Sequence, residues 1–273
     1  MLQTLQKVQF PRWIMKTIQQ LNSWFSCPKP NPQADLRLFC FPYAGGSSLI
    51  FRTWADSLPQ NVEVCSIELP GRLKQMKSPP FTGMEPLVSA IAPILLPYLD
   101  KPFAFFGHSM GGLLSFELAR QLRREHNLTP VHLFVSASRA PQIPSPKPPI
   151  HALPETEFKE ELRRLNGTPA SVLENTELMH LLTPILRADF AVLETYVYIQ
   201  EPPLECSITA FGGLEDQEVS LQELEGWRSQ TQNSFQLQMF SGDHFFIHSA
   251  QSLLIEDLAR DLRASTYTLL TEN

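Results

Sequence analysis

Ser109 stands in the middle of Gly-His-Ser-Met-Gly at residues 107–111, which fits the pattern G-x-S-x-G. An apolar run at 103–106 precedes this pattern, and an amphipathic run at 113–124 follows it. A serine placed between a buried strand and a helix is typical of a nucleophile elbow, a sharp turn that exposes the hydroxyl. The flanking glycines suit such a turn, because it brings neighbouring backbone too close for a Cβ atom.

A serine hydroxyl is a poor nucleophile unless a base takes its proton and a third group holds that base. Asp216 lies just beyond an apolar run at 206–211, and His244 lies just beyond an alternating run at 235–240. The order serine, acid, histidine, with each residue on a loop after a strand, is one known arrangement of a catalytic triad. We therefore predict that Ser109, Asp216 and His244 meet at one edge of a sheet.

Other acids and histidines are alternatives for the same roles. Glu215 and Asp243 are alternative acids, and His108 and His248 are alternative bases. Asp243 adjoins the predicted base in sequence and is expected to point away from it. His248 is expected in the last helix, and His108 is fixed within the elbow. The remaining histidines precede the acid and do not fit the order.

Stabilising an oxyanion requires two backbone N–H groups aimed at the oxygen where negative charge develops. Met110, the residue after the serine, is expected to supply one of them. Ala44, in the glycine-containing loop at 42–48, is expected to supply the other. The chain contains neither G-x-x-x-x-G-K nor G-x-G-x-x-G, so a phosphate-cradling loop is not predicted. No cluster of histidine, cysteine and carboxylate has metal spacing, and we expect neither a metal nor a cofactor.

Short apolar runs alternate with helical segments over most of the chain. This alternation indicates an α/β fold, with a mostly parallel sheet and helices on both faces. Strands are predicted at 36–41, 62–67, 103–106, 131–137, 206–211 and 235–240. Helices are predicted at 51–58, 86–99, 113–124, 221–230 and 248–263. Pro93 and Pro97 are expected to kink or shorten the second of these helices.

The alternation of strand-like apolar runs with helical segments stops between about 140 and 203. A proline-rich passage at 141–154 is followed by helical segments at 155–165, 174–182 and 184–199. We interpret this region as a helical lid that lies outside the sheet and shields the site. The alternative is that it adds further helices to the core.

The two ends of the chain are expected to lie outside the main domain at 35–265. Residues 1–34 are interpreted as an extension, with closely spaced prolines at 27–32 acting as an extended spacer. A helix within 1–20 would have one apolar face and several basic residues. That pattern suits docking or a membrane surface, but a loosely packed extension is favoured. Residues 266–273 are expected to form a loose tail.

The composition excludes several classes of protein. The 273-residue chain is 43% hydrophobic, enough for a sizeable core, and only 18% charged, unlike a disordered protein. Its formal net charge of −6 gives no electrostatic reason to bind nucleic acid or an anionic membrane. No secretory leader or membrane-length apolar stretch is seen. Cys40, Cys65 and Cys206 fall in strand-like runs and are expected to be buried, reduced thiols. We therefore expect a soluble, cytoplasmic monomer.

Five motifs resemble those of type II thioesterases, the stand-alone editing hydrolases of non-ribosomal peptide and polyketide synthases. They are LFCFPYAGG at 38–46, ELPGR at 68–72, GHSMGG at 107–112, LRADF at 186–190 and GDHFF at 242–246. The resemblance extends over about 22–263. It has two departures: Asp243 stands where a glycine is frequent in that family, and residues 1–20 precede its usual start.

The resemblance implies an α/β-hydrolase fold with a mobile helical lid. It also implies hydrolysis of acyl groups held as thioesters on the phosphopantetheine arm of carrier proteins, the expected partners. Residue by residue, it implies Ser109 as nucleophile, Asp216 and His244 as its partners, and Ala44 with Met110 as oxyanion donors. A carboxylester hydrolase or an acyltransferase would use the same residues, and a non-catalytic docking protein is a further alternative.

Overall fold

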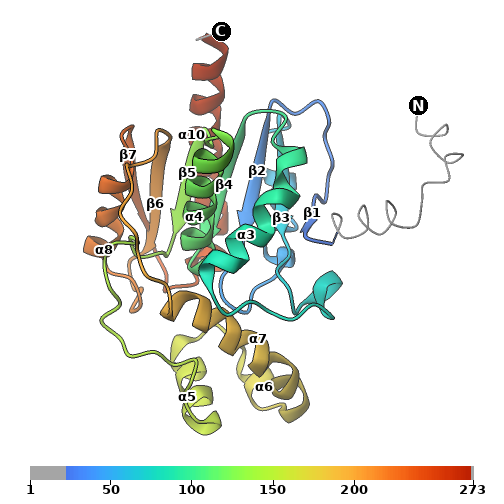
Figure 1. Ribbon diagram of the computed structural model, residues 1–273, viewed down its shortest axis with the longest axis vertical. Helices are drawn as coiled ribbons and strands as arrows, with labels where there is room; N and C mark the ends of the chain where they lie inside the picture. The colour runs from blue at the N-terminus through green and yellow to red at the C-terminus, as the bar shows by residue number, and fades with distance from the viewer. Residues whose placement is uncertain (1–22, 272–273) are drawn as a thin grey trace, which may run out of the picture.

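A seven-stranded sheet forms the centre of the protein, in the order β1-β3-β2-β4-β5-β6-β7 (Figure 1). The computed structural model describes residues 23–271, with side chains through residue 265. Neighbouring strands are parallel except β1 and β3, which are antiparallel. The strands are β1 (Phe25–Ser26), β2 (Leu36–Phe41), β3 (Val62–Ile67), β4 (Phe103–His108), β5 (His132–Ser136), β6 (Ser207–Gly213) and β7 (Phe235–Phe240).

Helices connect the strands and cover both faces of the sheet (Figure 1). The α-helices are α2 (Trp54–Ser57), α3 (Met84–Leu95), α4 (Met110–His126), α5 (Glu155–Leu165), α6 (Ala170–Leu173), α7 (Thr176–Glu194), α8 (Leu221–Glu225), α9 (Phe246–Ser249) and α10 (Gln251–Thr271). Short 3₁₀ helices are η2 (Ser48–Phe51), η3 (Leu73–Gln75), η4 (Leu96–Tyr98) and η5 (Gly226–Gln230). Helices α5, α6 and α7 lie together beyond one end of the sheet (Figure 1).

Two adjacent residues of β4 show how the sheet is buried on both faces. Phe105 belongs to the core formed with α3 and α4, whereas Phe106 belongs to the core formed with α10. Both side chains are completely buried. Burial on both faces explains why β4 reads as a continuous apolar run. Each phenylalanine contributes about 1.5–3 kcal/mol by leaving water. The two layers together hold the carboxyl end of β4, where the elbow begins.

The mostly parallel sheet confirms the predicted fold class. The strands at 36–41, 62–67 and 235–240 have the predicted bounds. The prediction was wrong at Pro184, because α7 is one helix that continues through this proline. A proline inside a helix removes a single backbone hydrogen bond. The buried residues on both sides of Pro184, among them Met179 and Leu186, hold the two halves in one line.

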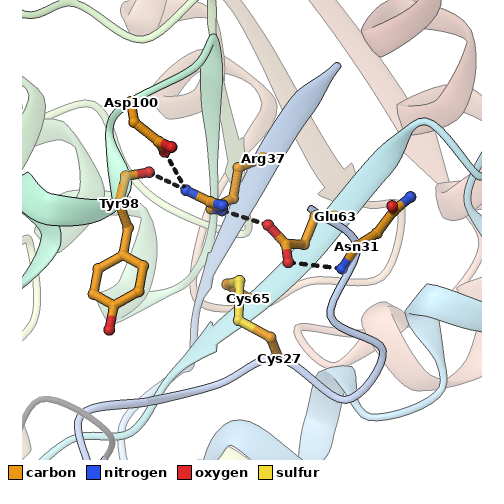
Figure 2. Close-up of a disulfide and its surroundings, with 7 residues drawn as sticks. All are labelled: Cys27, Asn31, Arg37, Glu63, Cys65, Tyr98 and Asp100. Carbon is orange, nitrogen blue, oxygen red and sulfur yellow. Dashed lines mark hydrogen bonds and ion pairs between the residues drawn. A yellow bond between two sulfur atoms is a disulfide. The ribbon is translucent and has the colours of Figure 1, made fainter. Parts of the chain in front are cut away.

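The prediction that Cys65 is a reduced thiol was also wrong, because Cys65 forms a disulfide with Cys27 (Figure 2). Strand β1, which was not predicted, pairs Phe25 with Ile67 and Ser26 with Ser66. This antiparallel pairing brings Cys27 opposite Cys65, with their Cα atoms 4.3 Å apart. The free thiols of Cys40 and Cys206 are buried, as predicted. The disulfide removes the reduced Cys65 thiol from the observations behind the expectation of a cytoplasmic protein.

The segment after Cys27 is anchored beside the disulfide. The backbone N–H of Asn31 donates to Glu63, whose carboxylate also pairs with Arg37 at 2.6 Å (Figure 2). Residues 23–34 are therefore fixed to the sheet edge, although we expected an extended spacer. The predicted helix in residues 1–20 lies outside the described residues.

The last helix is longer than predicted. Helix α10 continues to Thr271 instead of ending near residue 263, so the expected loose tail is helical as far as it is described. None of the helices in the described part of the chain has both the length and the apolar character that a membrane span requires.

Candidate active site

Ser109 occupies a sharp turn between β4 and α4. Its φ of 53° and ψ of −114° lie outside the helical and extended regions, a conformation that costs about 1–3 kcal/mol. Its N–H donates to the Ser136 carbonyl oxygen at 2.7 Å, which holds the turn against β5. A Cβ on Gly107 would lie 2.0 Å from the Gly111 oxygen, and one on Gly111 would lie 2.1 Å from the Phe41 oxygen. The tight elbow therefore requires glycine at both positions.

The predicted acid and base lie within hydrogen-bonding distance of this serine. His244 Nε2 is 3.0 Å from Ser109 Oγ, and His244 Nδ1 is 2.9 Å from Asp216 Oδ2. The other carboxylate oxygen of Asp216 accepts the backbone N–H groups of Glu218 and Val219. The Asp216 side chain is 1% exposed. Its orientation is thus fixed by three hydrogen bonds, and the imidazole that it holds can take a proton from Ser109.

The alternative acid and base have other partners. Asp243 accepts hydrogen bonds from the backbone N–H of Phe245 and from the Asn166 side chain, so it points away from His244, as predicted. His248 lies on the short helix α9, and its Nε2 is 3.0 Å from the Tyr43 hydroxyl. Within residues 23–271, neither Asp243 nor His248 forms a hydrogen bond with Ser109.

His108 has a contact that sequence reasoning missed. Its Nε2 lies 2.9 Å from the backbone oxygen of His244, and its Nδ1 lies 2.9 Å from Ser136 Oγ. Burial lowers the pKa of His108 well below its usual value, so the ring is neutral. Because a carbonyl can only accept, the proton is on Nε2, and Nδ1 accepts from the serine hydroxyl. The signal available in sequence was only that His108 adjoins the elbow.

The two predicted oxyanion donors lie on either side of the elbow. Met110 is the first residue of α4, where a backbone N–H has no partner within the helix. Ala44 follows the end of β2, the strand whose Phe41 oxygen packs against Gly111. Among residues 23–271, neither the Ala44 N–H nor the Met110 N–H has a hydrogen-bond acceptor. Both groups can therefore donate to a substrate oxygen.

Two cavities adjoin the site. One, of about 590 Å³, is lined by Ser109, Arg139, Lys147 and Tyr196 among others. The other, of about 220 Å³, is lined by Ala44 and His244, and otherwise mainly by apolar residues of the loop and lid. These apolar residues include Leu162, Leu165, Val172, Leu182, Ile185, Leu186, Phe190 and Phe245. Leu165 and Phe190 line both cavities, so they form part of the wall between them.

The lid is seated on the loops that carry the acid and the base. Arg164 and Lys147 each pair with Glu218 at 2.7 Å, two residues after Asp216. A Cβ on Gly167 would lie 2.4 Å from the ring of Phe245, so the turn after α5 packs on the residue next to the base. The lid has its own apolar cluster, formed by Ile150, Phe158, Leu162, Leu173, Met179 and Leu186. The segment at 140–203 thus contacts the loops beside Asp216 and His244, and its action as a lid stays a prediction.

Arg72 and Asp189, which belong to two of the motifs found in the sequence, also meet at the site. The Arg72 guanidinium lies 2.7 Å from the Asp189 carboxylate, and both side chains are buried. The sequence did not predict this pair, because 117 residues separate its members. Among the residues that the structure describes, no group of histidine, cysteine and carboxylate side chains could hold a metal ion.

The sheet topology and the placement of Ser109, Asp216 and His244 at strand ends define an α/β-hydrolase fold. Comparison with known proteins agrees with this class. A family model described as the thioesterase domain matches residues 36–265, and the chain belongs to this thioesterase family. It is accordingly a thioester hydrolase.

Individual relatives match over nearly their whole length. The chain is 49% identical to the gramicidin S biosynthesis protein GrsT of Aneurinibacillus migulanus, over 91% of this chain and 97% of GrsT. It is 44% identical to the linear gramicidin dehydrogenase LgrE of Brevibacillus parabrevis, over 92% and 97% of the two chains. The solved type II thioesterase BorB from the borrelidin biosynthetic cluster is 32% identical with a TM-score of 0.80, over 88% of this chain and 97% of BorB.

Proposed function

We propose that the protein is an editing thioesterase that releases acyl groups from the phosphopantetheine arm of carrier proteins. The observation that carries the proposal is the continuous hydrogen-bonded chain from Ser109 through His244 to the buried Asp216. The names of GrsT, a gramicidin S biosynthesis protein, and of BorB, a type II thioesterase of the borrelidin biosynthetic cluster, support the choice of carrier-bound substrates.

The reaction takes place in two steps. His244 Nε2 accepts the Ser109 proton while Oγ attacks the thioester carbonyl carbon, and the N–H groups of Met110 and Ala44 hold the oxyanion. Collapse of the tetrahedral intermediate breaks the carbon–sulfur bond, and the imidazolium protonates the departing thiol. Water then gives a proton to His244 and attacks the acyl-serine ester. The carboxylic acid leaves, and Ser109 regains its proton.

The two cavities support the proposal that the acyl chain and the phosphopantetheine arm lie in different cavities during the reaction at Ser109. The smaller cavity has mainly apolar walls and suits an acyl chain. The larger cavity, lined by Ser109, is roomier and suits the long phosphopantetheine arm; its Arg139, Lys147 and Arg164 side chains also pair with Glu223 or Glu218. The acyl chain then lies beside Leu165 and Phe190, which line both cavities.

The proposal is tested with a panel of acyl-carrier proteins of increasing chain length. Wild type should hydrolyse them, and Ser109→Ala should lose hydrolysis while its thermal unfolding stays unchanged. Release of the acyl group by Ser109→Ala at the wild-type rate would overturn the assignment of the nucleophile. A serine-directed fluorophosphonate should label wild type and leave Ser109→Ala unlabelled, whereas a non-catalytic docking protein would remain unlabelled in both forms.

Two other activities make different predictions. A carboxylester hydrolase or acyltransferase would act faster on an aryl ester or acyl-CoA than on an acyl-carrier protein, so matched rates on the three substrates separate these activities. LgrE is named a dehydrogenase, an activity that would need a nicotinamide cofactor. The loop after β2 lacks the G-x-G-x-x-G pattern for a dinucleotide and instead carries the two glycines beside Ala44. Substrate-dependent oxidation of a reduced nicotinamide by this protein would favour the dehydrogenase activity.

A further inference from the structure

Two buried side chains hold the loop that carries Ala44. Asp189 Oδ2 accepts the backbone N–H of Gly45 at 2.7 Å. Arg72 donates from one terminal nitrogen to both Asp189 oxygens, at 2.8 and 2.7 Å, and from the other to the Gly46 carbonyl oxygen at 2.8 Å. The pair therefore contacts an N–H and a C=O on two consecutive residues of the loop.

Solvent does not compete with these contacts. The Arg72 side chain is 8% exposed and the Asp189 side chain is 6% exposed. Burial raises the pKa of Asp189, while Arg72 and the Gly45 N–H favour its ionised form. Because the charges are withdrawn from water, each depends on the other and on the loop backbone for compensation.

The loop is also fixed by its fit against α7, the helix that carries Asp189. Gly45 has a φ of +76°, and a Cβ at this residue would lie 2.5 Å from Leu186 Cδ2. Tyr43 on the other side of Ala44 packs edge-on against Phe245, with ring centroids 5.1 Å apart. The Ala44 peptide thus lies between an aromatic contact and the polar contacts of Gly45 and Gly46.

We propose that Arg72 and Asp189 are positioning residues that orient the Ala44 N–H for the oxyanion. Since Asp189 belongs to α7 of the lid, the seated lid supplies part of the support for the oxyanion hole. The inference rests on the proposed function only in taking Ala44 as a donor, and it applies equally to ester and thioester substrates.

The test compares folded variants that lack the contacts of Arg72 and Asp189 with the loop against a control variant that keeps them. The double variant Arg72→Met/Asp189→Leu removes both charges, so that neither is left buried alone. Asp189→Asn keeps one oxygen for the Gly45 N–H and should lose less activity. Arg187→Gln is the matched control, because Arg187 lies on the same helix but contacts Phe158 and the His151 carbonyl within the lid region.

Two inhibitors separate positioning from a structural role. Ser109 Oγ adds to the carbonyl carbon of an acyl trifluoromethyl ketone, and the adduct carries an oxyanion. The thioether analogue has no carbonyl, so its affinity reports ground-state binding. In the double variant, we expect kcat to fall roughly 10- to 100-fold, short of complete loss of a donor, with KM within about threefold. Affinity for the ketone should fall by a similar factor, while affinity for the thioether analogue stays unchanged.

Three results would overturn the inference: unchanged ketone affinity in the folded double variant, equal loss for both inhibitors, or an equal loss in Arg187→Gln. Should the double variant not fold, the same comparison of Asp189→Asn with Arg187→Gln decides. The aryl ester is assayed in parallel with the thioester. A wild type that hydrolyses only the ester would refute the proposed function and leave the test of Arg72 and Asp189 intact.

Discussion

The imidazole of His108 lies 2.9 Å from the backbone oxygen of His244, so the residue before the proposed nucleophile is hydrogen-bonded to the proposed base. The other ring nitrogen contacts Ser136 at the end of β5. This arrangement connects the elbow directly to the loop after β7. The distance between Ser109 Oγ and His244 Nε2 therefore depends on a neutral histidine that takes no part in proton transfer.

His108→Leu should lower kcat by roughly 10- to 100-fold, because a displacement of the base by a fraction of an ångström to 1 Å has effects of this order. It also leaves a buried carbonyl without its donor, at a cost of about 1–3 kcal/mol in the free energy of unfolding. His108→Gln retains an N–H donor and should recover part of the rate. Steady-state kinetics and chemical denaturation measure both effects, and a His108→Leu enzyme with wild-type kcat would refute the role.

Asp216→Asn should lower kcat/KM by a factor on the order of 10⁴, because an amide in place of the carboxylate no longer fixes the productive tautomer of His244. The matched control is Asp243→Asn, which loses only contacts with Phe245 and Asn166. It should retain activity within a few-fold of wild type. A reversed order of the two losses would make Asp243 the acid.

Glu218→Gln should release the lid, because the carboxylate pairs with both Lys147 and Arg164. Its backbone N–H, which supports Asp216, is left in place. Limited proteolysis between residues 140 and 203 should become faster in the variant, and high salt should have a similar effect on wild type. Equal cleavage rates in variant and wild type would show that other contacts seat the lid.

The ion pairs of Glu218 with Lys147 and Arg164 should make protease cleavage of the segment at 140–203 depend on pH. Burial tends to raise the pKa of Glu218, but the hydrogen bonds from Lys147 and Arg164 outweigh it and lower the pKa. The ion pairs therefore stabilise the contact of residues 147 and 164 with Glu218 at and above the usual glutamate pKa range, and this contribution is lost as the pH falls through the lowered pKa. Lid cleavage by an acid-active protease should accelerate only at low pH in wild type and should show less pH dependence in Glu218→Gln.

His132 gives the whole domain a separate acid sensitivity. Burial lowers its pKa to about 4, and the neutral ring stacks on Phe134 and contacts Thr209, which in turn donates to Asp261. The unfolded chain binds the proton more readily, so the stabilisation is complete above pH ~6.5 and is lost between that pH and about 4. The loss is about 3 kcal/mol in the free energy of unfolding. Denaturation of His132→Gln across this pH range should show a smaller slope.

Local patterns were sufficient to predict six of the seven described strands and to place Ser109, Asp216 and His244 just after three of them. Ser109 has glycines and a strand-to-helix change beside it, Asp216 follows an apolar run that forms a strand, and His244 follows an alternating run that forms another. Parallel strands with α-helical connections then bring these residues to the same sheet edge. The sequence signals that predict Ser109, Asp216 and His244 therefore lie within a few residues of each side chain.

Contacts between distant segments could not be predicted in the same way. Strand β1 has only two residues, and its disulfide joins Cys27 to Cys65 across the sheet edge. Arg72 and Asp189 each belong to a recognised motif, but nothing in either motif specifies the other as its partner. The continuity of α7 through Pro184 depends on burial of its apolar face, which a proline rule applied to sequence does not consider.

The wall shared by the two cavities has a consequence for the order of events at Ser109. If the thiol arm and the acyl chain occupy different chambers, the arm can withdraw while the acyl group stays esterified to the serine. The chamber that it vacates then admits the hydrolytic water, and the carboxylic acid leaves from the smaller cavity. Under this arrangement, a carrier protein that stays bound after transferring its acyl group slows turnover, because its arm blocks the access of water to Ser109.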